Sequence, residues 1–247
     1  IGRLVGSEMC IRDRDTPPCF LVDCTPAPRP HAETLDERQM VHSPTTTPGN
    51  KPVVVGRNYS VVALLSKTPQ APSDKHWLVP LSAERVLPQE QGHVKGILQI
   101  EAIRKQLKLT DKLCVSVGDS AYGSESARRE VAKTANLIHI FRLASNRNVY
   151  SLVNGANSPA AGRRKIFGDK MMLNQKDTHL PPAQSLTLPW KTARGKDYQV
   201  TLKVWKNLVF RGARDFHAEH YPMTVVQVTV NNERGKPVFK RPMWLAA

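Results

Sequence analysis

The chain has 247 residues, a length that can bury a substantial core as one large domain or as a core with an insertion. It carries 36 Lys and Arg against 21 Asp and Glu, a formal charge of +15, so a polyanionic partner such as nucleic acid is expected. No apolar run approaches the roughly 18 residues of a membrane span. No secretory signal is visible, and the four cysteines form no CxxC pair, so neither a zinc site nor a disulfide scaffold is indicated. We therefore expect a cytoplasmic protein.

The first acidic residue of interest lies in an apolar run near the start. Residues 1–14 show no periodicity that links them to the rest of the chain, and we expect them to derive from an adapter sequence. Residues 19–25 read CFLVDCT and predict a strand with Asp23 at its inner end. Burying that carboxylate would be costly without a cation or a donor beside it. The next residues, 25–30, are too rich in proline for a helix or a central strand.

Two strands and a helix are predicted next. Residues 53–66 and 76–81 are β-branched and apolar, as strands are. Apolar side chains recur at helical spacing over residues 92–109, with Arg104 and several lysines on the remaining face. Such a helix would cross over the sheet and bring the following strand parallel to an earlier one.

The following strand carries the second acid. Residues 113–124 read LCVSVGDSAYGS, in which Leu113, Val115 and Val117 alternate with smaller residues and predict one buried face. Asp119 then stands at the strand end, held by rigid backbone and open to ligand. Asp and Gly after a strand are also ordinary turn residues, and that alternative stays open.

Asp23 and Asp119 considered as a pair indicate a candidate site for a divalent cation. If their strands are neighbours, the two carboxylates meet across the sheet and repel each other until a divalent cation neutralises them. Mg²⁺ is commonly held by one or two carboxylates together with water and phosphate oxygens.

Beyond Asp119, the sequence predicts one more helix and one more strand of an α/β fold. Ser124 is expected to cap a helix over residues 125–133, and residues 137–143 are expected to form a strand in which His139 is a hydrogen-bonded sheet residue.

The last third of the chain has a different composition. Residues 151–185, rich in Gly, Asn, Pro and charge, predict a linker or mobile arm. Residues 186–247 contain alternating β-branched and aromatic runs and predict a β-rich subdomain. Trp190, Trp205 and Trp244 are expected in its core, with base-stacking platforms as the alternative.

The order of five segments, LVDCTP, RPHAETL, GRNYSVVALL, GDSAYGS and FRLASNR, resembles bacterial insertion-sequence transposases of the DDE class. This resemblance implies an α/β fold with a ribonuclease H-like mixed sheet flanked by helices over residues 15–150. It also implies that residues 186–247 are the β-rich insertion that follows the second Asp in that family.

By the same resemblance, Asp23 and Asp119 would be the first and second catalytic, metal-binding aspartates. Two Mg²⁺ or Mn²⁺ ions would serve the complete protein. The partner would be DNA, both transposon terminal repeats and target, and the resemblance allows a homodimer on DNA and a location at the nucleoid.

We also expect residues that contact DNA, because Arg pairs well with phosphate. Ordinary solvated basic loops are the alternative for the arginines. The expected contacts are Arg29, Tyr122, Arg142, Asn146 and Arg147.

One departure from the family limits the prediction. The family's third acid is a Glu on a helix after the insertion, within a spaced Tyr, Arg, Glu, Lys pattern, and no such pattern occurs before Ala247. We therefore expect a truncated transposase core with impaired catalysis. A non-catalytic DNA-binding remnant and a basic structural protein are the alternatives.

Overall fold

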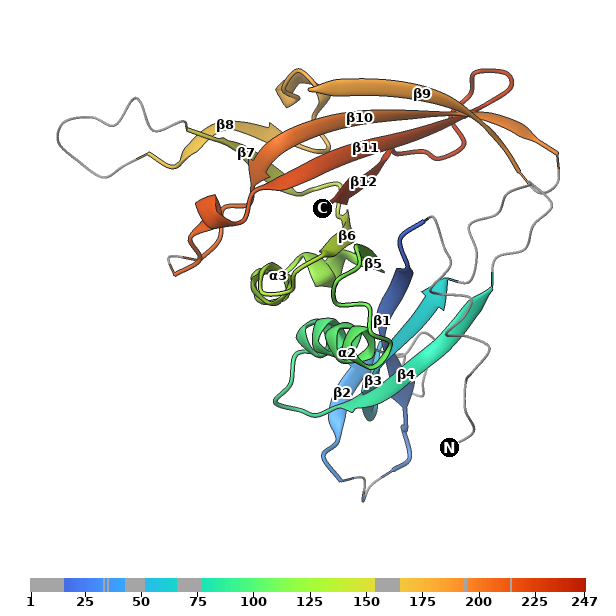
Figure 1. Ribbon diagram of the computed structural model, residues 1–247, viewed down its shortest axis with the longest axis vertical. Coiled ribbons are helices and arrows are strands. Elements are labelled where there is room, and N and C mark those ends of the chain that lie inside the picture. The colour runs from blue at the N-terminus through green and yellow to red at the C-terminus, as the bar shows by residue number, and fades with distance from the viewer. Residues whose placement is uncertain are drawn as a thin grey trace. The chain divides into compact units, whose positions relative to one another are not determined.

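The computed structural model describes residues 16–32, 34, 36–42, 52–65, 77–153, 165–192, 195–213 and 215–247. This part of the chain is α/β, with many strands and few helices, as predicted. It divides into two compact units (Figure 1). The first contains the described residues up to 122 together with 130–139, and the second contains 123–129 and 140–247. Residues 1–14, for which we predicted an adapter origin, lie outside the described residues.

The first unit is built on a mixed sheet. Its strands follow the order β2-β3-β1-β5-β6, and β4 pairs with β3 as well. The β1/β3 and β3/β4 pairs are antiparallel, whereas β1 and β5 are parallel. The strands are β1 (Cys19–Pro28), β2 (Gln39–His42), β3 (Val53–Leu65), β4 (Leu78–Val86), β5 (Cys114–Gly118) and β6 (Leu137–Leu143), of which β6 contributes its first three residues to this unit.

Helix α2 (Gly92–Gln106) covers one face of this sheet (Figure 1). Its close approach depends on Gly96, since a Cβ there would lie 2.6 Å from Val22 Cγ2. Arg104 is 1 % exposed, which corrects the prediction of a solvent-facing side chain. Burial of this guanidinium is compensated by Glu101 at 2.9 Å and by the carbonyl oxygen of Ala135 at 2.9 Å.

The buried face of β5 is the opposite of the predicted one. Cys114 and Ser116 are fully buried, whereas Leu113 is exposed and Val115 is half-buried. Strand alternation was recognised correctly, but the face was set by α2, which packs against the side that Phe20 shares. The smaller residues therefore face the core because the helix comes close there.

Strand β1 also runs further than predicted, through two prolines. Pro26 and Pro28 pair opposite Asn58 and Gly56 of β3. On the other side of β1, the pairing with β5 ends at Leu21, so the proline nitrogens need no partner there.

The second unit is a β-sheet of long strands (Figure 1). Its order is β6-β12-β11-β10-β7-β8, with β9 paired along the first part of β10. Residues 186–247 thus contain most of β9 and all of β10, β11 and β12. The strands are β7 (Asn148–Leu152), β8 (Phe167–Met172), β9 (Gln184–Lys191), β10 (Asp197–Val209), β11 (Met223–Asn232) and β12 (Met243–Ala246).

One further helix and three short 3₁₀ turns complete the elements of the described residues. Helix α3 (Glu125–Ala132) begins where predicted, and Ser124 Oγ accepts a hydrogen bond from Ala127 N. The 3₁₀ turns occur at Ser120–Gly123, Lys176–Thr178 and Ala218–His220. The stretch predicted as a linker thus includes strand β8 and one of these turns.

The three tryptophans of the second unit do not share one environment. Trp205 and Trp244 are 3 % and 1 % exposed and belong to the core, as predicted. Trp190 is 53 % exposed, so its predicted core position is wrong. It lies on β9, whose only strand partner in the described structure is β10, and every residue of β9 is exposed.

No helix in the described ranges is long and apolar enough to cross a membrane.

Candidate functional site

Asp23 lies in the middle of β1 and not at its inner end. It is the fifth of ten residues in the strand, and it is exposed. Side chains alternate along a strand, so Asp23 points away from the face where Val22 packs against Gly96 of α2. Because the carboxylate is exposed, the predicted cost of burial does not arise. Thr25 Oγ1 donates a hydrogen bond to Asp23 Oδ2 at 3.2 Å and orients it.

Asp119 follows directly after β5, as predicted. It is exposed, and its Oδ1 accepts a hydrogen bond from the backbone N of Ala121 at 2.9 Å. The turn that begins there is the 3₁₀ segment Ser120–Gly123. Both acids are therefore on ordered backbone, and each has one donor that fixes its orientation.

The register of the parallel pair relates the two acids. Cys19 lies opposite Val115 and Leu21 lies opposite Val117. The ladder ends at this last pair, and Asp23 and Asp119 each lie two residues beyond it along parallel chains. Neighbouring strands lie about 4.8 Å apart, so carboxylates that continued this register would be within reach of one ion.

The electrostatics of nearby groups agree with this proximity. Burial raises the pKa of Cys24, and the charges of Asp23 and Asp119 raise it further. The pKa of Tyr122 is likewise raised, first by burial and then by Cys24, Asp23 and Asp119. Two separate groups at this corner of the first unit therefore sense both carboxylates.

His93, at the start of α2, belongs to the same corner and was missed by sequence reasoning. Burial lowers its pKa, and the charge of Asp119 opposes part of that effect. Its Nε2 lies 3.1 Å from Gln91 Oε1. No local pattern distinguishes this His from any other polar residue at a helix start, since only the tertiary fold brings it near Asp119.

Tyr122 does not fit its predicted role as a DNA contact. It is 1 % exposed, and its ring fills space left by two glycines. A Cβ on Gly96 would lie 2.9 Å from its hydroxyl oxygen, and one on Gly118 would lie 2.7 Å from its Cγ. The ring is therefore a support for the Asp119 turn and has no surface to offer a ligand.

The other predicted DNA contacts are on the surface. Arg29 follows β1 in the first unit, and its Nη1 donates to Pro28 O at 3.3 Å. Arg142, Asn146 and Arg147 are exposed in the second unit. The guanidinium of Arg147 lies 5.8 Å from the centre of the Phe210 ring, within cation–π range.

The side chains at this corner supply only part of the ligands that a divalent cation needs. Within the described residues, no three His, Cys, Asp or Glu side chains gather as a metal site. Two carboxylates are nevertheless the usual protein contribution to Mg²⁺, which keeps several waters and takes substrate phosphate oxygens as further ligands. The carboxylates of Asp23 and Asp119 are therefore of the ligand type that such an ion takes.

His139 is confirmed as a hydrogen-bonded sheet residue. It is 5 % exposed, and its Nδ1 lies 2.7 Å from Ser116 Oγ.

A carboxylate on one strand and another just after the adjacent parallel strand, in a strongly basic α/β chain, suit metal-assisted chemistry on nucleic-acid phosphodiesters. A family model described as DDE superfamily endonuclease matches residues 4–201. The chain belongs to this family, a family of DDE-type transposases and endonucleases. The match takes in both acids, begins within the predicted adapter segment and ends within β10. A search of curated proteins finds no match.

Proposed function

We propose that this chain is the catalytic core of a DDE-type transposase, which cleaves DNA and transfers strands at transposon ends. The observation that carries the proposal is the parallel pairing of β1 and β5, because Asp23 and Asp119 each lie two residues beyond its last pair, Leu21 and Val117. The family match supports DNA as the substrate class.

The topology of the first unit supports a ribonuclease H-like core. Such a core opens with three antiparallel strands, which β1, β3 and β4 supply. Helix α2 then crosses over to a strand parallel to β1, which is β5. The first acid lies on the opening strand and the second follows the crossover strand, as the family requires.

Asp23 and Asp119 would hold Mg²⁺ or Mn²⁺ and the scissile phosphate between them. The bound ions would supply an activated oxygen nucleophile and stabilise the leaving oxygen. Thr25 Oγ1 and the backbone N of Ala121 hold the two carboxylates in their orientations. Without a bound cation, the two carboxylates would repel DNA phosphate.

Exposed cations would position the DNA. Arg29 in the first unit, and Arg142 and Arg147 in the second, offer guanidinium groups for phosphate, and Asn146 adds an amide. Because these contacts displace counterions, DNA affinity should fall steeply as salt rises. Tyr122 is left out of this set because it is buried.

A second candidate is a DNA-binding protein with little or no cleavage activity. It is favoured by one observation: within the described ranges, no third metal-binding side chain joins the two aspartates. With only two carboxylates, one of the two ions would lack a ligand, and we expect cleavage by this chain to be weak.

Metal binding by the full chain tests the proposal. We expect Asp23→Asn and Asp119→Asn each to weaken Mn²⁺ binding, measured by calorimetry, by roughly tenfold or more, since even outer-shell groups contribute 10–100-fold. Asp111→Asn is the matched control, because Asp111 is an exposed acid just before β5. Mn²⁺ binding that is equal in all three variants and the parent chain would exclude Asp23 and Asp119 as ligands.

Cleavage of labelled duplex DNA in Mn²⁺ separates the two candidates. Weak cleavage that disappears in Asp23→Asn supports the transposase core. Salt-dependent DNA binding without any Mn²⁺-dependent cleavage supports the DNA-binding protein.

A further inference from the structure

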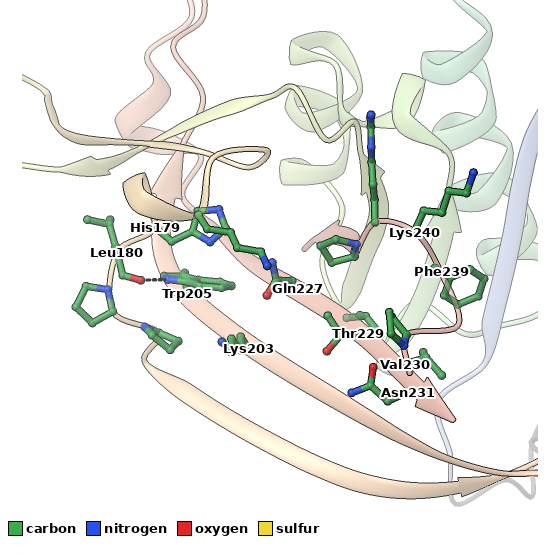
Figure 2. A pocket seen from close by; sticks show the side chains of 17 residues that line it. His179, Leu180, Lys203, Trp205, Gln227, Thr229, Val230, Asn231, Phe239 and Lys240 are labelled. Atoms are coloured by element: carbon green, nitrogen blue, oxygen red, sulfur yellow. Dashed lines mark hydrogen bonds between the residues drawn. The ribbon is translucent and has the colours of Figure 1, made fainter. Parts of the chain in front are cut away.

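The second unit contains a cavity that shares no residue with the aspartate site. Its volume is about 670 Å³, and all of its lining residues lie between 176 and 242 (Figure 2). Three parts of the chain form it: the segment around the Lys176–Thr178 turn, the paired strands β10 and β11, and the loop 237–242 that leads to β12. A cavity of this size accommodates a ligand larger than a single ion.

The charge of the lining is entirely positive. Lys176, Lys203, Lys240 and Arg241 line the cavity, and no Asp or Glu does. In the described part of the chain, none of these four forms an ion pair with an acid. Cations that line one cavity without a counter-charge repel one another, and an anion with several oxygens relieves that repulsion. The lining therefore favours a ligand with phosphate groups.

An exposed aromatic ring also lines the cavity. Phe239 is 53 % exposed and immediately precedes Lys240 and Arg241 in the loop (Figure 2). Pro237 and Pro242 flank this stretch and restrict its backbone. Burying Phe239 against a flat apolar partner would be favourable, and a nucleic-acid base provides such a partner while its phosphates reach the neighbouring cations.

Polar groups for a base edge are also present. Gln227 and Asn231 of β11 carry amide side chains on the cavity wall, and these can both donate and accept hydrogen bonds. The side chain of Trp205, which also lines the cavity, is held in place by two contacts. Trp205 donates from Nε1 to Leu180 O at 2.7 Å, and its ring lies 5.5 Å from that of Trp244.

We propose that this cavity binds a segment of single-stranded DNA, with phosphates on Lys203, Lys240 and their neighbours and an unstacked base on Phe239. A duplex would offer no free base to stack on Phe239, because paired bases are stacked within the helix. A free nucleotide shares the same chemistry, so the experiment must distinguish it from a strand. The proposal does not depend on metal binding by Asp23 and Asp119.

Fluorescence anisotropy of the full chain with a labelled 12-nucleotide single strand, in EDTA and at low salt, tests the assignment. Stacking on one aromatic ring contributes about 1–3 kcal/mol, so Phe239→Ala should weaken binding by about 5- to 150-fold. Trp190→Ala is the matched control, because Trp190 is equally exposed but does not line the cavity. Duplex of the same sequence should bind equally to both variants and to the parent chain.

A charge variant tests the phosphate contacts. Lys203→Gln should lower the slope of log affinity against log salt by about 0.7 for a single strand. Lys206→Gln, on the same strand but outside the lining, should leave the slope unchanged if the cavity is the site.

Three results would overturn the proposal. One is single-strand binding that Phe239→Ala leaves intact. Another is an equal loss in Phe239→Ala and Trp190→Ala. The third is displacement of the oligonucleotide by a mononucleotide at the same nucleotide concentration, which would assign the cavity to a free nucleotide. Because the assay contains EDTA, none of these results bears on the aspartate site.

Discussion

The two charged surfaces of this chain rest on different kinds of support. Asp23 and Asp119 belong to a sheet whose helix-covered face contains buried polar side chains, among them Ser116 paired with His139 and Gln99 bonded to Ser60 O. The cationic cavity of the second unit rests on an aromatic floor, where Trp205 lies against Trp244.

This difference in support predicts which change destabilises each unit. Hydrogen-bonded polar groups stabilise a sheet only while their protonation states are kept, so the first unit should respond to pH. An aromatic floor stabilises through buried area and packing, so the second unit should respond mainly to loss of volume. Three changes test this contrast, and the expected effect decreases from Trp244 through His139 to Gly118.

Removing the most deeply buried tryptophan should have the greatest effect. Trp244 is 1 % exposed and contacts both Trp205 and His179, with ring centres 5.5 and 5.3 Å apart. Trp244→Ala should lower the free energy of unfolding by about 3–5 kcal/mol, measured by urea denaturation. Trp190→Ala, at an exposed site, should cost less than about 1 kcal/mol. Similar losses of unfolding free energy in the two variants would contradict the inference that the packing of Trp244 stabilises the second unit.

Acid should act on the first unit through His139. Burial lowers the pKa of His139 to about 4, although a backbone hydrogen bond with Tyr122 opposes this. The native state therefore keeps the ring neutral, while the unfolded chain takes up a proton as the pH falls through about 6.5. Stability that is complete above pH 6.5 is then lost between pH 6.5 and 4, by up to about 3 kcal/mol.

The measurement for His139 compares unfolding free energies at pH 7 and pH 4 in the parent chain and in His139→Gln. The variant should lose about 3 kcal/mol less over this interval, because it has no ring to protonate. Equal losses of unfolding free energy in both proteins would show that His139 is not the source of the acid sensitivity.

A single methyl group should disturb the aspartate site. In Gly118→Ala the new Cβ would lie 2.7 Å from Tyr122 Cγ, and the buried ring has no room to move. We expect a cost of about 1–3 kcal/mol in unfolding free energy and weaker Mn²⁺ binding, because Asp119 is the next residue. Ser120→Ala, exposed in the same turn, is the control. Unchanged metal affinity in Gly118→Ala would show that the Tyr122 packing does not position Asp119.

The sequence alone determined most elements of the chain. The strand carrying Asp23, the strand that ends before Asp119, helix α2 and the capped helix α3 were all predictable from apolar periodicity and turn residues, which are local properties. Both aspartates were identified the same way, since each interrupts or follows an apolar run. Their relation across the sheet also followed from a local rule, that a crossover helix makes parallel neighbours.

Only the tertiary structure decided which side of each element is buried. The core face of β5, the burial of Arg104 and Tyr122, and the exposure of Trp190 all depend on which element packs above them. The cationic cavity depends on this even more, because Lys176, Lys203 and Lys240 come from three separate segments. Periodicity specifies the faces of an element, whereas packing between distant segments selects which face becomes core and which residues meet.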